Sequence, residues 1–253
     1  MSIKIKPLYL HKLLILKTIT MAKKDEIKGY VVYEGASMIN GAPIVGIVTI
    51  ESKNIKTGNM ANLWILHAEI KPNEAVKSGD DSAVCGECPL RRFSGGACYV
   101  LPYHAPLSVF KSWKRGNYSK IDSYEVFEGL KMRFGAYGDP LALPTDILVG
   151  LKSVVKNNTS YTHQWETENS QIVKNLTMAS VETVKQAKVA QSKGWRTFRV
   201  IKKESQLMDN EIMCPNYTHG VKCIDCNLCN GASSKAKNIA IVVHGAKAKK
   251  FDF

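Results

Sequence analysis

Apolar and polar residues alternate in short runs along the first part of the chain. The runs are YVVYEG, PIVGIVTIES and NLWILHAEI, and Gly, Asn and Lys residues separate them. Runs of β-branched and aromatic residues bounded by such turns are typical of β-strands. The segment KNIKTGN, between the second and third runs, is typical of a hairpin loop. We therefore predict a β subdomain over residues 28–70.

The pattern changes after residue 104. The segment APLSVFKSWKRGNY carries apolar residues at helical spacing, and PTDILVGLKSVVKN and ETVKQAKVAQSKG resemble it. These helix-like segments are interspersed with the strand-like runs KMRFGAYG, TSYTHQW, NLTMASV, GWRTFRVI and NIAIVVHG. Strands that alternate with amphipathic helices indicate a parallel sheet, either open or closed into a barrel. The fold class that we predict is α/β.

These patterns also predict how the chain is organised. Residues 1–27 form a basic N-terminal extension that we expect to be mobile, and Met21 within it begins a second start-like segment, MAKKDEIKGYVVYEG. A single α/β domain spans residues 28–245, and a basic tail covers 246–253. Within the domain, the β subdomain is followed by a cysteine loop at 71–103, βα units at 104–205, a cysteine-rich insertion at 206–238 and a last strand at 239–245.

Composition narrows the class of protein. The chain has 253 residues, of which 45% are hydrophobic and 23% charged, which excludes low-complexity disorder, collagen and a long coiled coil. No run is long and apolar enough to span a bilayer, so we expect no membrane contact and a cytoplasmic location.

The balance of charges favours an anionic partner. Lys and Arg exceed Asp and Glu by 35 − 22 = 13, which is consistent with a nucleic acid or a nucleotide as partner. The best cluster of basic and aromatic residues is Lys111, Trp113, Lys114, Arg115 and Tyr118, for which the alternative is an ordinary solvated face.

Three of the seven cysteines lie close together in SAVCGECPLRRFSGGACYV. Cys85 and Cys88 form a CxxC pair, and Cys98 follows nine residues later. Zinc and iron–sulfur clusters both take thiolate ligands, and an odd cysteine count in CxxC groups indicates a reducing compartment. Three thiolates leave zinc one ligand short unless a residue such as His104 completes the set. Three is also the number at which a [4Fe–4S] cluster keeps one iron open.

The other four cysteines lie in MCPNYTHGVKCIDCNLCNG. They are Cys214, Cys223, Cys226 and Cys229, and the last three form a CxxCxxC spacing. Four thiolates complete the ligand set of a zinc ion or of a fully ligated [4Fe–4S] cluster, and His219 could replace one sulfur. The spacing indicates a metal, and both metals stay open at this point. Zinc that only holds the loops together would require no chemistry.

The order of these motifs resembles the layout of radical S-adenosylmethionine enzymes. Tyr99 follows Cys98, and Gly138, Asp139 and Pro140 end a strand-like run 40 residues further on. In that superfamily a three-cysteine loop follows the first barrel strand, an aromatic residue adjoins its last cysteine, and a GGEP-like turn contacts the methionine moiety. An auxiliary cluster in a C-terminal cysteine-rich extension is also common there.

The resemblance implies a partial parallel (β/α) barrel with the N-terminal β subdomain and cysteine-rich loops attached. It implies that Cys85, Cys88 and Cys98 hold a catalytic [4Fe–4S] cluster and that the last four cysteines hold an auxiliary one. Tyr99, Gly138, Asp139 and Pro140 would contact S-adenosylmethionine. Two features depart from the pattern, because the spacing is CxxCx₉C where CxxxCxxC is usual, and Asp139 replaces a glutamate.

A second resemblance covers nearly the whole chain, from residue 30 to 245. The sequence resembles a group of phage and prophage proteins that share KTGN, a cysteine loop ending in CY, YGDP, YTHQW, MASV, GWRTFRV, a terminal CxxCxxC and IVVHG. It implies a phage or mobile-element origin, and therefore a bacterial host cell, but it carries no established activity.

Several polar residues near predicted strand ends are further candidates. In a βα-barrel the carboxyl ends of the strands surround the active site, so His163 and Gln164 are candidate catalytic or substrate-contacting residues. Ser180 is a candidate for cofactor contact by the same argument. Arg196 and Arg199 lie on opposite faces of GWRTFRV, so one of them could bind a carboxylate or phosphate in a pocket. A surface ion pair is the alternative.

Two functional hypotheses follow. The first is an iron–sulfur enzyme, radical-SAM-like, that acts on a nucleotide, a nucleic acid or a peptide. The second is a zinc-stabilised α/β protein that binds nucleic acid through its basic surface without catalysis. A third variant keeps the metal for folding alone.

Overall fold

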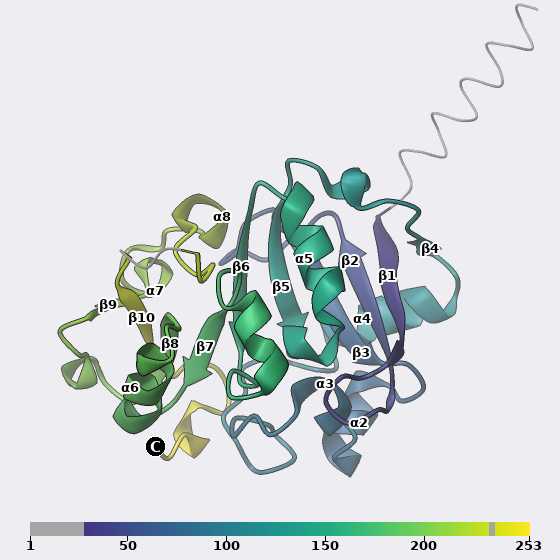
Figure 1. Cartoon of the computed structure of the whole chain (residues 1–253). Coiled ribbons are helices and arrows are strands. Elements are labelled where there is room, and N and C mark those ends of the chain that lie inside the picture. The colour runs from purple at the N-terminus through teal and green to yellow at the C-terminus, as the bar shows by residue number, and fades with distance from the viewer. Residues whose placement is uncertain (1–27, 233–235) are drawn as a thin grey trace, which may run out of the picture.

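The computed structural model describes residues 28–232 and 236–253. The predicted basic extension at 1–27 lies outside the described residues. Figure 1 shows a central sheet with helices on both faces. The helices are α2 (Pro72–Ser78), α3 (Ser82–Cys85), α4 (Ala105–Lys114), α5 (Thr145–Val154), α6 (Val184–Ser192), α7 (Pro215–His219) and α8 (Cys223–Cys226). Short 3-10 helices are η1 (Tyr124–Phe127), η2 (Pro140–Ala142), η3 (Glu168–Val173), η4 (Glu204–Gln206) and η5 (Ala248–Lys250).

The sheet contains ten strands within the described residues, in the order β4-β1-β2-β3-β5-β6-β7-β8-β10-β9. Strands β1 (Gly29–Ala36), β2 (Pro43–Thr49) and β3 (Ala61–His67) pair antiparallel, as the hairpin signal predicts. From β3 onward every neighbouring pair is parallel. These strands are β5 (Lys131–Tyr137), β6 (Asn157–Thr162), β7 (Met178–Val181), β8 (Thr197–Ile201), β10 (Asn238–Val242) and the edge strand β9 (Glu211–Met213). The short β4 (Ser119–Lys120) pairs with β1 at the other edge.

The predicted α/β class is confirmed, and the sheet is mixed, mostly parallel and open. Strands β3, β5, β6, β7, β8 and β10 are neighbours in the same order in which they occur along the chain. A doubly wound sheet reverses its strand order at a switch point, whereas a singly wound sheet does not. The β subdomain predicted at 28–70 continues directly into the parallel strands through the pairing of β3 with β5.

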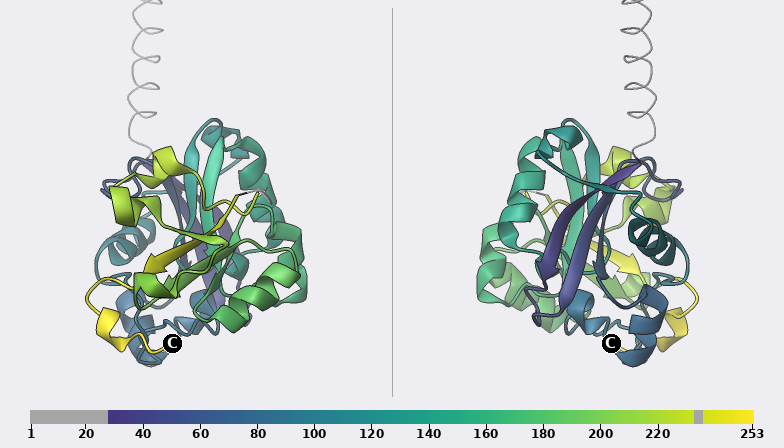
Figure 2. Two further views of the ribbon diagram at one scale, coloured as in Figure 1. Left: turned by 90° about the vertical axis from the view of Figure 1, so that its left-hand side faces the viewer. Right: turned by 90° about the vertical axis from the view of Figure 1, so that its right-hand side faces the viewer.

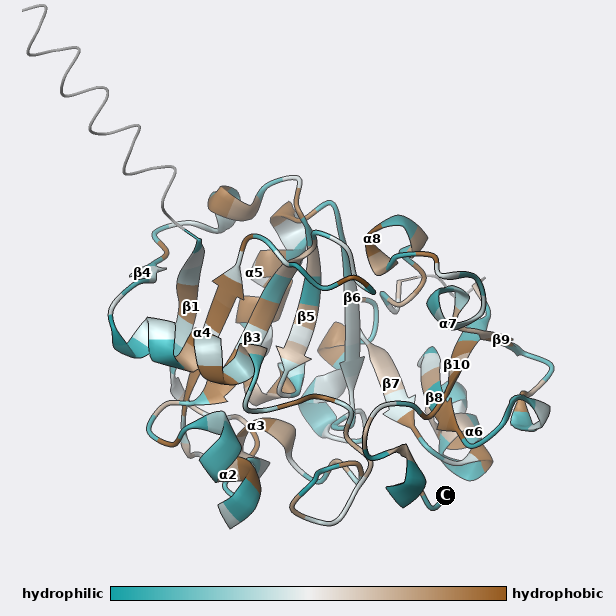
Figure 3. Ribbon diagram, turned by 180° about the vertical axis from the view of Figure 1, so that it is seen from behind, coloured by the Kyte–Doolittle hydropathy of each residue, from teal (hydrophilic) through white to brown (hydrophobic). Residues whose placement is uncertain are grey.

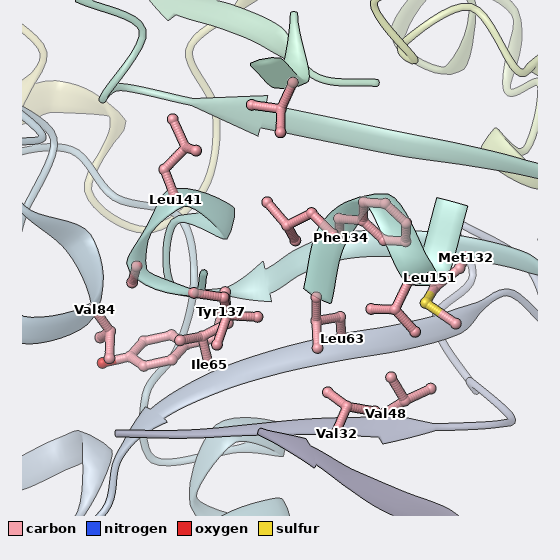
Figure 4. Packing of buried hydrophobic residues seen from close by; sticks show 14 of the residues in the cluster. Val32, Val48, Leu63, Ile65, Val84, Met132, Phe134, Tyr137, Leu141 and Leu151 are labelled. Carbon is pink, nitrogen blue, oxygen red and sulfur yellow. The ribbon is translucent and has the colours of Figure 1, made fainter. Parts of the chain in front are cut away.

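Helices α5 and α6 cover one face of the parallel strands (Figure 1). Leu148 and Leu151 of α5 are fully buried, and so are Met132 and Phe134 of β5. Figure 4 shows Leu151 beside Met132 and Phe134, with Leu63 of β3 below them. Burial of each such side chain contributes about 1.5–3 kcal/mol. The main core therefore lies between β3, β5 and α5.

Helix α6 packs on β7 and β8 in a different way. Thr183 and Gln186 form a capping box at its first turn, which satisfies backbone N–H groups that have no partner within the helix. Its buried residues, Ala187 and Ala190, are small, so the helix axis can lie close to the sheet.

Loops and cysteine-bearing segments cover much of the opposite face. Figure 2 shows α5 and α6 on one side of the sheet and the C-terminal segment with α8 on the other. In the view from behind, α4 lies over β1 and β3, and α7 and α8 lie beside β10 (Figure 3). Cys223 donates its backbone N–H to the Lys56 carbonyl over 3.1 Å, and Ile224 donates to the Thr57 carbonyl over 3.0 Å. These bonds join the β2–β3 loop to the segment before β10, across the side where a barrel would close.

Along the described part of the chain, none of the helices has the length and apolar character needed to cross a membrane.

A buried ion pair joins β8 to β9. Arg199 donates through Nε and Nη2 to the two carboxylate oxygens of Glu211, over 2.8 and 2.7 Å, and both side chains are almost fully buried. Arg199 therefore takes neither of the two roles considered for it: its partner is inside the protein, and the pair is not at the surface.

We predict that Glu211→Gln destabilises the fold by about 3–5 kcal/mol, because it leaves the buried guanidinium of Arg199 without a counter-charge. Urea unfolding of both proteins measures the difference. Asp252→Asn is the matched control, since it removes a carboxylate that pairs with Lys202 in solvent. Equal stability of Glu211→Gln and the wild-type protein would contradict the prediction.

Candidate functional site

A partly open cavity of about 260 Å³ lies against the face of the parallel strands that α5 and α6 leave free. Each of five parallel strands contributes at least one side chain to its wall: Arg133, Tyr161, Ser180, Phe198 and Ile241. Five of the seven cysteines also line it: Cys85, Cys88, Cys98, Cys214 and Cys223. The two cysteine groups, which the sequence presents as separate motifs, therefore adjoin one cavity. All seven cysteines are free thiols.

The first cysteine group lies at the carboxyl ends of the parallel strands. Arg91 holds its loop in place, because it donates to the Gly79 and Gly86 carbonyls and pairs with the buried carboxylate of Asp81 over 2.6 Å. Burial raises the pKa of the Cys85 thiol well above its usual value, and the neighbouring Cys88 and Cys98 raise it further. The three predicted ligands thus lie near enough to influence one another's ionisation.

His163, at the end of β6, contacts the same cysteine group. Its Nε2 lies 3.8 Å from the Cys88 sulfur and 2.8 Å from a carboxylate oxygen of Glu182. Burial alone would lower the pKa of His163, but contact with Cys88 and Glu182 raises it well above its usual value. Because the thiol and the carboxylate share one ring nitrogen, this is not the arrangement of a nucleophilic triad, in which the acid binds the other nitrogen.

Three cysteines of the second group, Cys223, Cys226 and Cys229, lie toward the opposite ends of the same strands, whereas Cys214 follows β9 and donates its N–H to the Ala240 carbonyl of β10. Lys131, the first residue of β5, donates to the Ile224 carbonyl, and Ser160 of β6 donates its N–H to the Cys229 carbonyl. Burial raises the pKa of Cys229 to about 12, and the other three thiols of the group contribute to this rise. The first cysteine group and the CxxCxxC part of the second therefore lie toward opposite ends of the parallel strands.

The thiols lie near one another, but they do not form a complete coordination sphere for a metal ion. Among residues 28–232 and 236–253, no three or more Cys, His, Asp or Glu side chains form a group that could hold a metal ion. The two histidines that the sequence offered as extra ligands, His104 and His219, are exposed. His163, in contrast, is partly buried and places an imidazole nitrogen 3.8 Å from the Cys88 sulfur.

The predicted cofactor turn follows β5 and contacts the cysteine loop. The N–H of Asp139 donates to the Val84 carbonyl, and the carboxylate of Asp139 accepts hydrogen bonds from the Thr162 hydroxyl and the His163 N–H over 2.7 and 2.8 Å. Gly138 and Asp139 line the cavity, whereas the buried Pro140 opens η2 behind them. The turn therefore ties β5, β6 and the first cysteine group together, and contact with a cofactor stays a prediction.

The remaining predicted residues divide between the cavity and the scaffold. Ser180 and Tyr99 line the cavity, and Tyr99 stacks on His244 with ring centroids 5.3 Å apart. Gln164 packs against the first cysteine group, where its amide approaches the Cys85 carbonyl at 3.5 Å. Arg196 does not line the cavity. It donates to the Leu228 and Lys237 carbonyls and so anchors the cysteine-rich insertion to β8.

Arg133 also lines the cavity, although none of the sequence motifs identified it. It precedes Phe134 in KMRFGAYG, and the burial of Met132 and Phe134 on the helix-covered face places Arg133 on the other face of the strand. Strand alternation could therefore have identified it. Its Nη2 donates to the Tyr99 hydroxyl. Burial lowers the pKa of Arg133, but the hydroxyl groups of Tyr99 and Tyr161 raise it on balance, so the guanidinium is charged.

The basic and aromatic cluster predicted for an anionic partner lies on α4 and the turn after it. Lys114 places its ammonium over the Trp113 ring, 4.4 Å from the centroid, and Lys111 and Arg115 are exposed. This contact is consistent with either a solvated face or a binding face.

Comparison with known proteins yields no assignment. No protein-family model matches the chain, and no curated protein or solved structure matches it significantly.

We predict that Gly96→Ala disrupts the first cysteine loop. A Cβ there would lie 2.5–2.7 Å from backbone atoms of Pro89, Leu90 and Arg91, so the loop between Cys88 and Cys98 must open, at a cost of roughly 3 kcal/mol. Thermal unfolding measures this cost. Gly95→Ala is the control, because that position has φ +79° and open space around it, and so costs only about 1 kcal/mol of backbone strain. A smaller loss for Gly96→Ala than for Gly95→Ala would refute this prediction.

Proposed function

We propose that the chain is an iron–sulfur metalloprotein with a radical-SAM-like arrangement, whose cavity on the free face of the sheet is the reaction site. The proposal places a [4Fe–4S] cluster on Cys85, Cys88 and Cys98 and an auxiliary cluster on Cys214, Cys223, Cys226 and Cys229. Its substrate class is a nucleotide, a nucleic acid or a peptide, in a phage-infected bacterial cell.

The observation that carries the proposal is the position of the three-thiol group. It follows β3, the first of the parallel strands, and lies beside the ends of β5 and β6, where it lines the cavity. Active sites of parallel βα folds form at the carboxyl ends of the strands. The strands from β3 to β10 also follow one another in chain order, as they do in a singly wound barrel.

The donor set suits a cluster. Free thiols are the ligands that iron–sulfur clusters require, and each thiolate binds a different iron, so the sulfurs need not surround one point. A single zinc ion makes a stricter demand on the sulfurs. They must all surround one point and lie about 3.8 Å from one another, given a Zn–S distance of about 2.3 Å. With three thiolates bound, the fourth iron would stay open toward the cavity.

The chain's own residues would then position a cofactor and substrate. Tyr99, Gly138, Asp139 and Ser180 line the same cavity as the proposed cluster ligands, and S-adenosylmethionine would be held against them. When bound, cluster and cofactor supply one-electron and radical chemistry. His163 and Gln164 adjoin the cysteine loop, so their role would be to fix the position of Cys88 and Cys85.

A specific contact favours a second candidate function. His163 offers a nitrogen next to Cys88, so Cys85, Cys88, Cys98 and His163 could form a Cys₃His zinc site after side-chain movement. The chain would then be a zinc-stabilised α/β protein that binds nucleic acid through its basic surface.

We predict that protein purified without oxygen is brown, absorbs near 400 nm and contains about four irons per cluster, or about eight in all, with matching sulfide. Cys85→Ser should lose about half of the iron, and Cys226→Ser should lose the other half. Elemental analysis and ultraviolet–visible spectra measure both quantities.

The two variants serve as controls for each other, because each leaves the opposite end of the cavity intact. Colourless protein that contains zinc alone would overturn the iron–sulfur proposal. In that case a steep fall of DNA or RNA affinity with increasing salt would support the second candidate.

A further inference from the structure

The guanidinium of Arg133 lies in the cavity without a counter-charge. Within the described part of the chain, no carboxylate lies within 4 Å of it, and its Nε is buried without a hydrogen-bond partner. Its one hydrogen bond goes to a neutral hydroxyl, that of Tyr99. The Arg133 side chain is half-buried, so its charge loses part of its hydration and gains no ion pair in return, which is unfavourable.

Arg91, Arg196 and Arg199 differ from Arg133 in their surroundings. Arg199 pairs with both oxygens of Glu211, and Arg91 pairs with Asp81. Arg196 has no counter-charge, but it donates to two backbone carbonyls. The Nε atoms of Arg91 and Arg196 also lack a partner, so the feature that distinguishes Arg133 is its place on the cavity wall, where none of these three lies. Arg133 is thus the arginine on the cavity wall, and its position on β5 is fixed by the burial of Met132 and Phe134.

Aromatic rings surround the same space. Tyr99 stacks on His244, and Tyr161 packs on Phe198 with ring centroids 4.2 Å apart. Both pairs line the cavity. Faces of such rings accept a planar group by stacking, while a guanidinium binds a phosphate or carboxylate through two parallel hydrogen bonds.

We infer that the cavity binds a small molecule consisting of a planar ring and one anionic group, with the anion on Arg133 and the ring against the aromatic pairs. A nucleoside monophosphate has this chemistry, and so does an aromatic carboxylate. The inference rests on the proposed function, because it takes the same cavity as the reaction site. Of the substrate classes proposed there, it favours a single nucleotide over a nucleic acid or a peptide. A pocket of about 260 Å³ suits one monomer better than a duplex or a folded peptide.

Cys223 lies near enough to Arg133 to raise the pKa of the guanidinium. In the proposed function Cys223 is a metal ligand, and a centre held by four thiolates keeps a net negative charge that partly offsets the charge of Arg133. It supplies no hydrogen bond to the guanidinium, however, whose Nε stays without a partner, so the donors of Arg133 remain available to an anionic group of a ligand.

Titration calorimetry on the full-length protein, purified without oxygen, tests the inference. The probes are uridine 5′-monophosphate, benzoate and uridine, which separate a phosphate, a carboxylate and the neutral ring. We expect at least one of the two anionic probes to bind at least tenfold more tightly than uridine. Arg133→Met should abolish this preference, and Arg133→Lys should restore part of it.

Arg115→Met is the matched control, because it removes the same charge from the exposed end of α4 and should leave the preference unchanged. Thermal unfolding establishes that the Arg133 variants are folded. Equal affinity for the charged and neutral probes, absence of binding, or a preference that survives in folded Arg133→Met would overturn the inference.

The result is separable from the metal analysis. Zinc-only protein with Arg133-dependent binding would overturn the proposed function and support the anion site. Iron-loaded protein without a charge preference would do the opposite.

Discussion

When parallel strands follow one another in chain order, the connecting helices cover one face of the sheet and leave the other face largely without helices. Right-handed crossovers bring consecutive helices to the same side, and α5 and α6 accordingly lie together on one face. The other face keeps apolar and polar side chains that need cover. In a closed barrel the strands themselves would enclose it, whereas here the β2–β3 loop and the segment before β10 meet across the gap. Lys56, Thr57 and Cys223 all line the cavity, so this contact builds one of its walls.

Strand direction explains why the two cysteine groups lie at opposite ends of the cavity. The first follows β3 and so lies where parallel strands end, next to Asp139 and His163. Cys223, Cys226 and Cys229 of the second group precede β10 and so lie where the parallel strands begin, next to Lys131, whereas Cys214 follows β9 beside Ala240. The two cysteine groups, which are far apart in the sequence, are therefore also separated along the strand direction. Between them lie aromatic rings and one guanidinium, so the cavity is a mainly apolar space with thiols at both ends.

Much of the fold could be predicted from the sequence, because hydrophobic periodicity reports which residues are buried. The alternation in KMRFGAYG and the helical spacing in PTDILVGLKSVVKN correspond to β5 and α5. Strands β4 and β9 escaped prediction, since two or three residues are too few to show a period. Helices α3 and α8, of four residues each, depend on tertiary contacts for the same reason.

The candidate site was only partly predictable. Cysteine spacing identified the thiols, but it could not show that both groups adjoin one cavity, because that depends on strand order. Arg196 and Arg199 shared a strand that suggested a pocket, yet backbone carbonyls and Glu211 bind them. Arg133 belongs to no motif, so no sequence signal of that kind could identify it.

The contact between the β2–β3 loop and the segment around Cys223 also has a consequence for biosynthesis, because these two segments lie more than 160 residues apart in the chain. Nascent chains that stop before Cys223 have one wall of the cavity missing, so any metal or small molecule that needs both ends can be retained only once translation has passed that point.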